Sequence, residues 1–252
     1  LSTTLPLYIS MPLMLILTVI IGFAIERVAY KPLRSAPRMS IMISAIGVSY
    51  LLQNLAAYIT GGLAQQYPTI PGISNSVSIG PATTKVVTLV TPFLVIALVF
   101  GLVMLINHTK IGMAMRAVAK DYDTAQLMGI KINAVISATF VIGSFLAAIG
   151  SVLYFTNYTA VTYTSGAMPG LKAFVAAVFG GIGSIPGAVI GAFIIGICEN
   201  IVKGLEAMLA MAGINLNLGL ATFSDAVTFA LLIIILVVKP TGLFGEKATE
   251  KV

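Results

Sequence analysis

Long apolar stretches separated by short polar ones run through the whole chain. The longest cover residues 5–25, 39–60, 86–106, 134–156 and 219–238. A helix needs roughly 20 apolar residues to cross the core of a bilayer, which is about 30 Å thick, and each stretch meets that length. The strands of a membrane barrel would instead alternate apolar and polar residues over about 10 positions. The pattern therefore predicts an all-α bundle of transmembrane helices, because helices satisfy their own backbone hydrogen bonds in lipid.

The pattern is irregular in the last third of the chain. Residues 171–179 are apolar but too short to cross a bilayer alone, and residues 180–196 contain six glycines and one proline, which disfavour a plain helix. Broken helices at membrane depth occur where they are buried in protein or line a cavity. We therefore expect, in order, a broken helical region near residues 171–187, a crossing over residues 185–200 and a short amphipathic loop over residues 203–217.

Charged residues are scarce and unevenly placed. They make up 9% of the chain, and the mean hydropathy is +1.05; soluble domains carry roughly 25% charged residues, so a water-soluble fold is excluded. Of the 14 Lys and Arg residues, 11 lie in residues 26–38, in residues 107–133 and after residue 238. Because basic loops stay on the cytoplasmic side, these segments and the C-terminus are expected to be cytoplasmic, and the loop over residues 61–85 external. The pI near 9.5 then reflects topology, and no nucleic-acid partner is expected.

No set of residues suited to catalysis is visible in the sequence. His108 is the only histidine and Cys198 the only cysteine, so a metal cluster built from several such residues is excluded. The serines have no paired base, and the GGIGS sequence at residues 180–184 lacks the lysine of a phosphate-binding loop. We therefore expect no catalytic, metal or cofactor site and predict that the chain is not an enzyme.

Two acidic residues, Glu199 and Asp225, lie within apolar stretches. Each stands near an end of its stretch, where the simplest interpretation is a carboxylate that is solvated at the helix end. Transporters driven by protons or ions usually carry a buried ionisable relay. Because no such relay is visible, a mechanism powered by this chain alone is disfavoured.

The longest charged interruption is residues 107–133, with the sequence NHTKIGMAMRAVAKDYDTAQLMGIKIN. Most positions from 112 to 128 favour a helix, and Gly129 fits the position just after its end. Such a helix in a cytoplasmic loop can lie on anionic membrane lipid or dock a cytoplasmic partner. The residues alone leave both interpretations open.

This predicted helix is amphipathic. Arg116, Lys120 and Asp123 follow one another at spacings of four and three, so they are expected to share one face. A second, apolar face holds Ala114, Val118, Ala125 and Met128. The basic face is the part of the segment expected to contact lipid headgroups or a partner.

Residues 116–130 within this interruption resemble the coupling loop of ABC importer permeases. The Asp-Thr-Ala sequence at residues 123–125, followed by Gly129, resembles that loop's acidic-Ala-Ala-xxx-Gly pattern, with Asp in place of Glu and Thr in place of the first Ala. Four further segments are similar to the branched-chain amino acid permease family, and favour its H-type over its M-type subunit: ERVAYKPLR (26–34), ISAIGVSYLLQNLA (43–56), PGLKAFVAAVFGGIGSIPGAVIGA (169–192) and KPTGLFGE (239–246). The resemblance runs over nearly the whole chain.

The resemblance implies the membrane-spanning permease subunit of a binding-protein-dependent ABC importer. The expected cargo is a branched-chain amino acid (leucine, isoleucine or valine) or a related small amino acid or amide. It also implies a single permease domain over residues 1–252 in the bacterial inner membrane, a second permease subunit in a homo- or heterodimer, two cytoplasmic ATPase subunits and an external solute-binding protein. A self-sufficient secondary transporter or channel for a small polar solute stays the alternative.

Particular residues receive roles from the same resemblance. Residues expected to couple the ATPase to the bundle are Arg116, Lys120, Asp123, Ala125 and Gly129. Residues expected along the solute path are Gln53, Asn54, Gly180, Gly181, Gly183 and Ser184. Adjacent helical residues point about 100° apart, so at most one of Gln53 and Asn54 faces the solute. Hydrogen bonding between helices is the alternative for either amide, and close helix packing is the alternative for the glycines.

The start of the sequence departs from the family pattern. Family members usually begin with a further helical region that carries an Asn-Phe-Ala-His-Gly stretch, and this sequence begins at Leu1 without it. We therefore expect the natural protein to have additional helices before residue 5.

Overall fold

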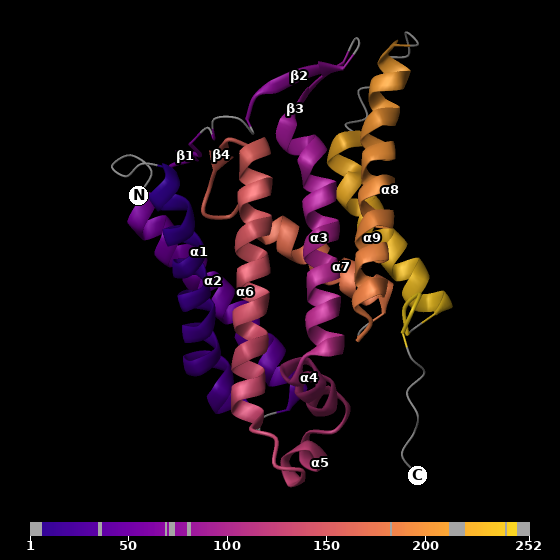
Figure 1. The fold of residues 1–252 in the computed structure, drawn as a ribbon. Coiled ribbons are helices and arrows are strands. Elements are labelled where there is room, and N and C mark those ends of the chain that lie inside the picture. Colours follow the sequence, from indigo (N-terminus) through magenta and orange to yellow (C-terminus); the bar gives the residue numbers. More distant parts are fainter. Residues whose placement is uncertain are drawn as a thin grey trace. The chain divides into compact units, whose positions relative to one another are not determined.

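The structure is a computed structural model that describes residues 7–34, 37–68, 70, 74–79, 82–181, 183–211, 220–239 and 241–245. The chain divides into two compact units, Leu1–Thr164 and Ser165–Val252. The helices of the first unit are α1 (Leu7–Ile25), α2 (Arg38–Thr60), α3 (Val86–His108), α4 (Lys110–Lys120), α5 (Tyr122–Leu127) and α6 (Ile132–Asn157). Those of the second unit are α7 (Ala167–Gly180), α8 (Ile185–Met211) and α9 (Leu220–Val238) (Figure 1).

Five helices in the described part of the chain are long and apolar enough to cross a membrane. They span Tyr8–Leu33, Met39–Thr60, Val86–His108, Ile132–Asn157 and Ile185–Leu205. Two shorter helices, Ala167–Gly180 and Phe223–Val238, are also apolar. The prediction of a polytopic helical protein is confirmed, and the apolar stretches of the sequence fall on these helices, although the first helix runs on to Leu33.

The first helix continues further than the sequence indicated. Glu26–Tyr30 forms a π-helical turn and Lys31–Leu33 a 3-10 turn, where a basic loop was expected from residue 26 onward. Pro32 lies at the start of the 3-10 turn, where its missing backbone N–H costs little. The extension carries the side chain of Glu26 into the interior of the unit, where none of it is exposed.

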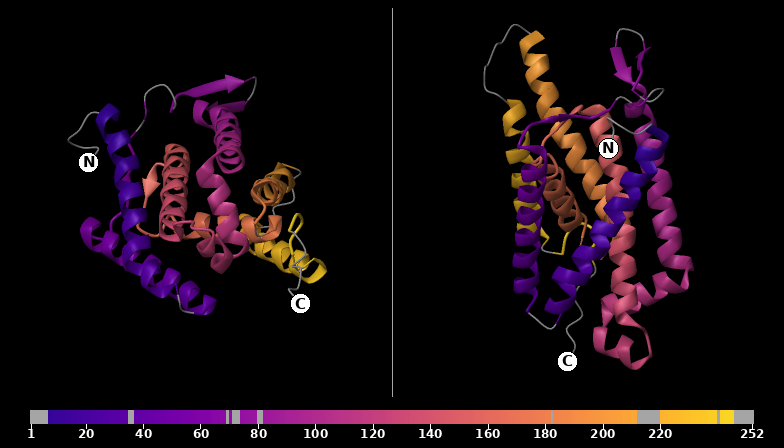
Figure 2. Two further views of the ribbon diagram at one scale, coloured as in Figure 1. Left: turned by 60° about the horizontal axis from the view of Figure 1, so that its bottom comes forward. Right: turned by 90° about the vertical axis from the view of Figure 1, so that its left-hand side faces the viewer.

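Short strands join the loops at the end of the first unit opposite α4 and α5 (Figure 2). β1 (Gln65–Gln66) pairs antiparallel with β4 (Ala160–Val161), and β2 (Ser76–Ile79) pairs antiparallel with β3 (Ala82–Lys85). The sequence indicated only a loop over residues 61–85. The two ladders therefore add local order to that segment without changing the helical class of the fold.

Lys85 connects this end of the unit to α6. Its Nζ donates to the carbonyl oxygens of Thr156 and Asn157, at 3.4 and 2.9 Å. A cation at the C-terminal end of a helix complements the partial negative charge there. Nearby, burial raises the pKa of the Tyr67 hydroxyl, and the Tyr67 ring packs against Phe155. The one basic residue of an otherwise uncharged loop thus has a structural role.

In the second unit the chain breaks between α7 and α8. Gly181 and Gly183 have φ angles of +109° and +99°, which stop α7 and redirect the chain. The expected break is confirmed there, and the crossing expected over residues 185–200 is part of α8, a regular helix from Ile185 onward despite its glycines. The loop expected over residues 203–217 is wrong up to residue 211, because α8 continues to Met211, and residues 212–217 lie outside the described residues.

Close approach of α7 and α8 explains why a glycine-rich sequence stays helical. A Cβ added at Gly191 would lie 2.6 Å from the carbonyl oxygen of Ala176 and 3.0 Å from the backbone nitrogen of Gly180. The contact between the two backbones offsets the low helix propensity of glycine. The buried core beside this contact consists of Val175, Ala176, Phe179 and Ile195.

The segment after α9 completes the end of α7. The backbone N–H groups of Leu243 and Phe244 donate to the carbonyl oxygens of Phe179 and Gly180, both at 2.9 Å. The last carbonyls of a helix have no partner within that helix. The segment after α9 therefore satisfies groups that the break at Gly181 leaves open.

Replacing Gly191 by alanine is expected to disrupt the packing of α7 on α8, because the added carbon would meet backbone atoms. Gly196→Ala is the matched control in the same helix, since nothing lies within 4 Å of a carbon added there and alanine favours a helix by about 1 kcal/mol. After heating in detergent, the fraction that stays monodisperse in size-exclusion chromatography should fall for Gly191→Ala only. Equal behaviour of the two variants would contradict the close approach.

Candidate functional site

The segment predicted to couple the chain to a partner begins with a tight turn after α3. Thr109 has an extended backbone, and its Oγ1 accepts a hydrogen bond from the backbone N–H of Gly112 at 3.1 Å, which caps the start of α4. Gly112 is buried, and a Cβ there would overlap the backbone of Ile106. The glycine therefore permits α4 to fold back directly against the end of α3.

The single helix expected over residues 112–128 is two helices, α4 and α5. Asp121 interrupts it with an extended backbone (φ −152°, ψ +109°), and its Oδ1 accepts from the backbone N–H of Thr124 at 3.2 Å. An Asp that caps a new helix start competes with helix continuation. The expectation that Asp123 shares one helical face with Arg116 and Lys120 is therefore wrong, because the break lies between them.

Gly129 ends α5 as the sequence predicted. The φ angle of Gly129 is +79°. Its backbone N–H donates to the carbonyl oxygen of Gln126 at 3.0 Å, and the backbone N–H of Ile130 donates to the carbonyl oxygen of Ala125 at 3.2 Å. This pair of hydrogen bonds is the Schellman motif, which needs a left-handed residue at this position. Ala125 is 4% exposed, so it anchors α5 against the rest of the unit.

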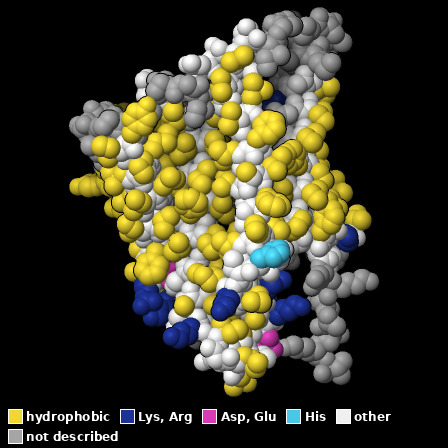
Figure 3. Space-filling view, in the orientation of Figure 1, with side chains coloured by type: hydrophobic (Ala, Val, Ile, Leu, Met, Phe, Trp, Pro, Cys, Tyr) yellow, Lys and Arg dark blue, Asp and Glu magenta, His cyan; other side chains and the backbone are white. Residues whose placement is uncertain are grey.

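The α4–α5 segment presents a basic and apolar surface. Arg116 and Lys120 are exposed, and the guanidinium of Arg116 makes only long contacts, of 3.4 and 3.5 Å, with Asn107. Figure 3 shows Lys and Arg side chains gathered at the end of the first unit that carries α4 and α5. Leu127 and Met128 are 87% and 78% exposed at the tip of α5. The sequence had grouped Met128 with Ala125 on one apolar face, but the two are separated.

A cleft of about 400 Å³ lies between α5 and the start of α6. Its lining residues are Tyr122, Gln126 and residues 130–134. The cleft opens beside the exposed tip of α5. The segment therefore offers a partner both a projecting apolar tip and an adjoining depression.

A polar network around the buried Glu26 joins the end of α1 to the start of α6, and sequence reasoning missed it. The Glu26 carboxylate is fully buried and pairs with the Arg34 guanidinium, which also donates to Oδ1 of Asn133. The Ser137 hydroxyl donates to the second carboxylate oxygen of Glu26 at 2.8 Å. Asn133 and Ser137 lie in the first turns of α6, directly after the α4–α5 segment. The only signal in the sequence was an acidic and a basic residue spaced eight apart, Glu26 and Arg34. That spacing does not predict the π-helical turn that buries Glu26.

The residues expected along a solute path have structural partners of their own. Gln53 Nε2 donates to Ser49 Oγ at 3.2 Å and Asn54 Nδ2 donates to the carbonyl oxygen of Tyr50 at 2.8 Å. Both bonds lie within α2, so the amides do not join helices in the described structure. Their role along a path stays a prediction.

The glycines and serine at the helix break are placed by packing and capping. Gly180 is the last residue of α7, and Gly181 and Gly183 form the break. Ser184 Oγ accepts from the backbone N–H of Gly187 at 3.2 Å, which caps α8. The structure brings these four residues together, and their contact with a solute stays a prediction.

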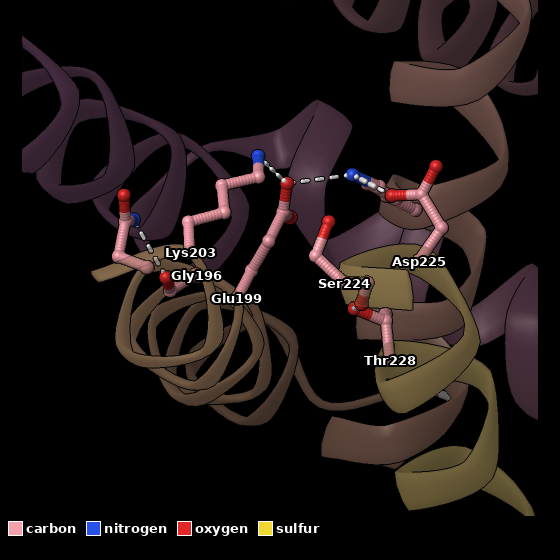
Figure 4. A network of polar contacts seen from close by, with 8 residues as sticks. Gly196, Glu199, Lys203, Ser224, Asp225 and Thr228 are labelled. Atoms are coloured by element: carbon pink, nitrogen blue, oxygen red, sulfur yellow. Dashed lines mark hydrogen bonds and ion pairs between the residues drawn. The ribbon is translucent and has the colours of Figure 1, made fainter. Parts of the chain in front are cut away.

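A second charged network crosses the three helices of the second unit (Figure 4). Lys172 Nζ lies 2.8 Å from Glu199 Oε1 and 2.7 Å from Asp225 Oδ1. Lys203 Nζ lies 2.5 Å from the same Glu199 oxygen. The interpretation of Glu199 as a solvated carboxylate at a helix end is wrong, because Glu199 lies well inside α8 and its side chain is 14% exposed. Asp225 does lie near the start of α9, partly exposed, but it pairs with Lys172 on α7. Among the described residues, no three His, Cys, Asp or Glu side chains gather to hold a metal ion.

The long apolar helices define a multi-pass membrane protein. Residues 1–236 match the family model described as "Branched-chain amino acid transport system / permease component". The chain belongs to this family, whose members are transport subunits rather than enzymes.

Relatives in three organisms place the chain within the family. It is 40% identical over 237 residues to the high-affinity branched-chain amino acid transport system permease protein LivH of Salmonella typhimurium, covering 92% of this chain and 72% of that protein. It is 37% identical over 257 residues to the corresponding protein BraD of Pseudomonas aeruginosa, covering 96% and 78%. It is 27% identical over 243 residues to the probable permease LivH of Methanocaldococcus jannaschii, covering 94% and 74%. No solved structure matches the chain significantly.

Replacing Glu26 by alanine is expected to lower stability strongly, because Arg34 would keep a largely buried charge without its partner. Breaking a buried ion pair in this way costs about 3–5 kcal/mol. Asp123→Ala is the control, since Asp123 is an exposed acid in the same unit. The midpoint of thermal aggregation in detergent should fall for Glu26→Ala and stay unchanged for Asp123→Ala. A Glu26→Ala variant as stable as the native protein would contradict the buried pair.

Proposed function

We propose that this chain is the permease subunit of an ABC importer that carries branched-chain amino acids inward. The energy comes from ATP hydrolysis on separate cytoplasmic subunits. The observation that carries this proposal is the α4–α5 segment. It is a capped, largely exposed helical pair that interrupts the apolar helices in a chain of the permease family. The names of the relatives supply the class of cargo.

Docking of an ATPase on α4–α5 follows from the chemistry of its surface. The exposed cations of Arg116 and Lys120 favour an acidic rim on the partner, whereas Leu127 and Met128 favour an apolar depression. Gly129 then returns the chain to the membrane through α6. A complete importer would contain two such ATPase subunits, a second permease subunit and an external solute-binding protein.

The orientation of the chain follows from its basic segments. The hydrogen bond between Arg34 and Asn133 brings residues 26–34 next to the end of the 107–133 segment. Two of the three basic segments therefore lie at one end of the first unit, as the rule that basic loops stay inside requires. We assign that end to the cytoplasm, and the basic segment after residue 238 to the same compartment.

A secondary transporter is the second candidate, and one observation favours it. Ionisable groups inside membrane helices often couple a solute to an ion gradient, and Lys172, Glu199 and Asp225 are such groups. Reconstitution discriminates between the candidates. Uptake of leucine by vesicles that hold this chain alone, driven by an ion gradient, would favour the secondary transporter. Uptake only with ATP and the partner subunits would favour the importer.

Reversing the charge of Arg116 is expected to lower ATP-driven leucine uptake at least about tenfold, a loss of about 1.4 kcal/mol in productive docking. The Arg116→Glu variant should insert normally, because Arg116 is exposed and forms no short contact. Lys31→Glu is the matched control, since it reverses an exposed charge on the same side of the membrane but outside α4–α5. Uptake and co-purification of the ATPase are measured together. Normal values for Arg116→Glu would remove the docking role.

A further inference from the structure

The charged network of the second unit lies among apolar helices, and its Glu199 stands in the part of α8 that is long and apolar enough to cross a membrane. Glu199 is in the interior of α8, about 21 Å along the axis from Ile185 at a rise of about 1.5 Å per residue. Asp225 lies in the second turn of α9, and Lys172 in the second turn of α7. The apolar core of a bilayer is only about 30 Å thick. Glu199 therefore lies inside the apolar stretch that could cover this core, about 9 Å from its end at Leu205.

The network is not enclosed by its own unit. The side chains of Lys172, Asp225 and Lys203 are 24%, 33% and 43% exposed. A charged group that faces hydrocarbon costs several kcal/mol, so such groups face the bundle interior or a water-filled cavity. Glu26 provides a contrast within the same chain, because its carboxylate is fully enclosed. In a permease, charges left open in this way need water or a ligand as a further partner.

The charges alternate in sign along the network. Asp225, Lys172, Glu199 and Lys203 form a row in which neighbours are 2.5 to 2.8 Å apart, with no net charge. An amino acid carries one ammonium and one carboxylate. Inserted between Asp225 and Lys172, it would place its ammonium on Asp225 and its carboxylate on Lys172. One ion pair is replaced by two, so every charge has a partner once the amino acid is bound.

We propose that Lys172 and Asp225 bind the zwitterionic head group of the translocated amino acid, with Glu199 as the positioning residue that holds Lys172. This inference rests on the proposed cargo class. On this inference the permease recognises only the ammonium and the carboxylate of the amino acid. Because the head group is common to all amino acids, this site does not distinguish leucine from valine.

Replacing the charged residues by uncharged ones of similar size distinguishes a role in binding the amino acid from a role in helix packing. Replacing an ion-pair network by uncharged residues of similar size is often neutral for stability. The test variant is therefore Lys172→Met with Glu199→Gln and Asp225→Asn, reconstituted as the complete transporter with ATPase, second permease and binding protein. Asn200→Ala is the matched control, since Asn200 is exposed on the same helix and donates to the carbonyl oxygen of Gly196 in that helix.

Leucine uptake and ATP hydrolysis are measured on the same vesicles. The triple variant is expected to lose at least about tenfold in leucine moved per ATP, whereas ATP hydrolysis stimulated by the binding protein persists and Asn200→Ala stays within about twofold. Leucine uptake per ATP at the native level in the triple variant would overturn the inference, as would a parallel fall of uptake and ATP hydrolysis. Absence of ATP-driven uptake by the native complex would instead overturn the proposed function.

A single substitution covers the case in which the triple variant does not assemble. Asp225→Asn leaves the Lys172–Glu199 pair intact and removes only the proposed ammonium contact. Its KM for leucine is expected to rise at least about tenfold with unchanged thermal stability. A native KM in this variant would overturn the inference.

Discussion

The structure depends on the cost of leaving a charge unpaired in apolar surroundings. Glu26 is enclosed by Arg34 and Ser137, and this network joins α1 to α6. Lys172 pairs with Glu199 and Asp225, which joins α7 to α8 and α9. In each unit the few charges that enter the membrane region therefore hold helices together. A chain with so few charged residues places several of them at its helix contacts.

If an ATPase docks on α4–α5 as proposed, the buried ion pair of Glu26 and Arg34 would pass its movement on to other helices of the first unit. The α4–α5 segment ends at Gly129, and α6 begins at Ile132. The network around Glu26 contacts α6 in its first turns, through Asn133 and Ser137. The rings of Tyr30 and Phe140 pack one turn further along, with centroids 5.2 Å apart. A displacement of α6 at its start would therefore carry the end of α1 with it.

The sequence predicted features set by local chemistry and missed those set by distant partners. The transmembrane helices follow from apolar length, and Gly129 follows from the left-handed conformation that a helix end needs. The break at Asp121 was missed because capping competes with a favourable helix propensity. The burial of Glu26 depends on Asn133 and Ser137, which lie about a hundred residues away. Candidate residues could thus be named, but their contacts could not.

The cap on α7 has a consequence for the order of membrane insertion. The carbonyl oxygens of Phe179 and Gly180 receive their hydrogen bonds from Leu243 and Phe244, which follow α8 and α9 in the chain. A ribosome therefore releases α7 long before its partners exist. Those two oxygens must be solvated, or shielded by the insertion machinery, until α9 has entered the bilayer. The hydrogen bonds that complete α7 can therefore form only after the segment that follows α9 has been synthesised.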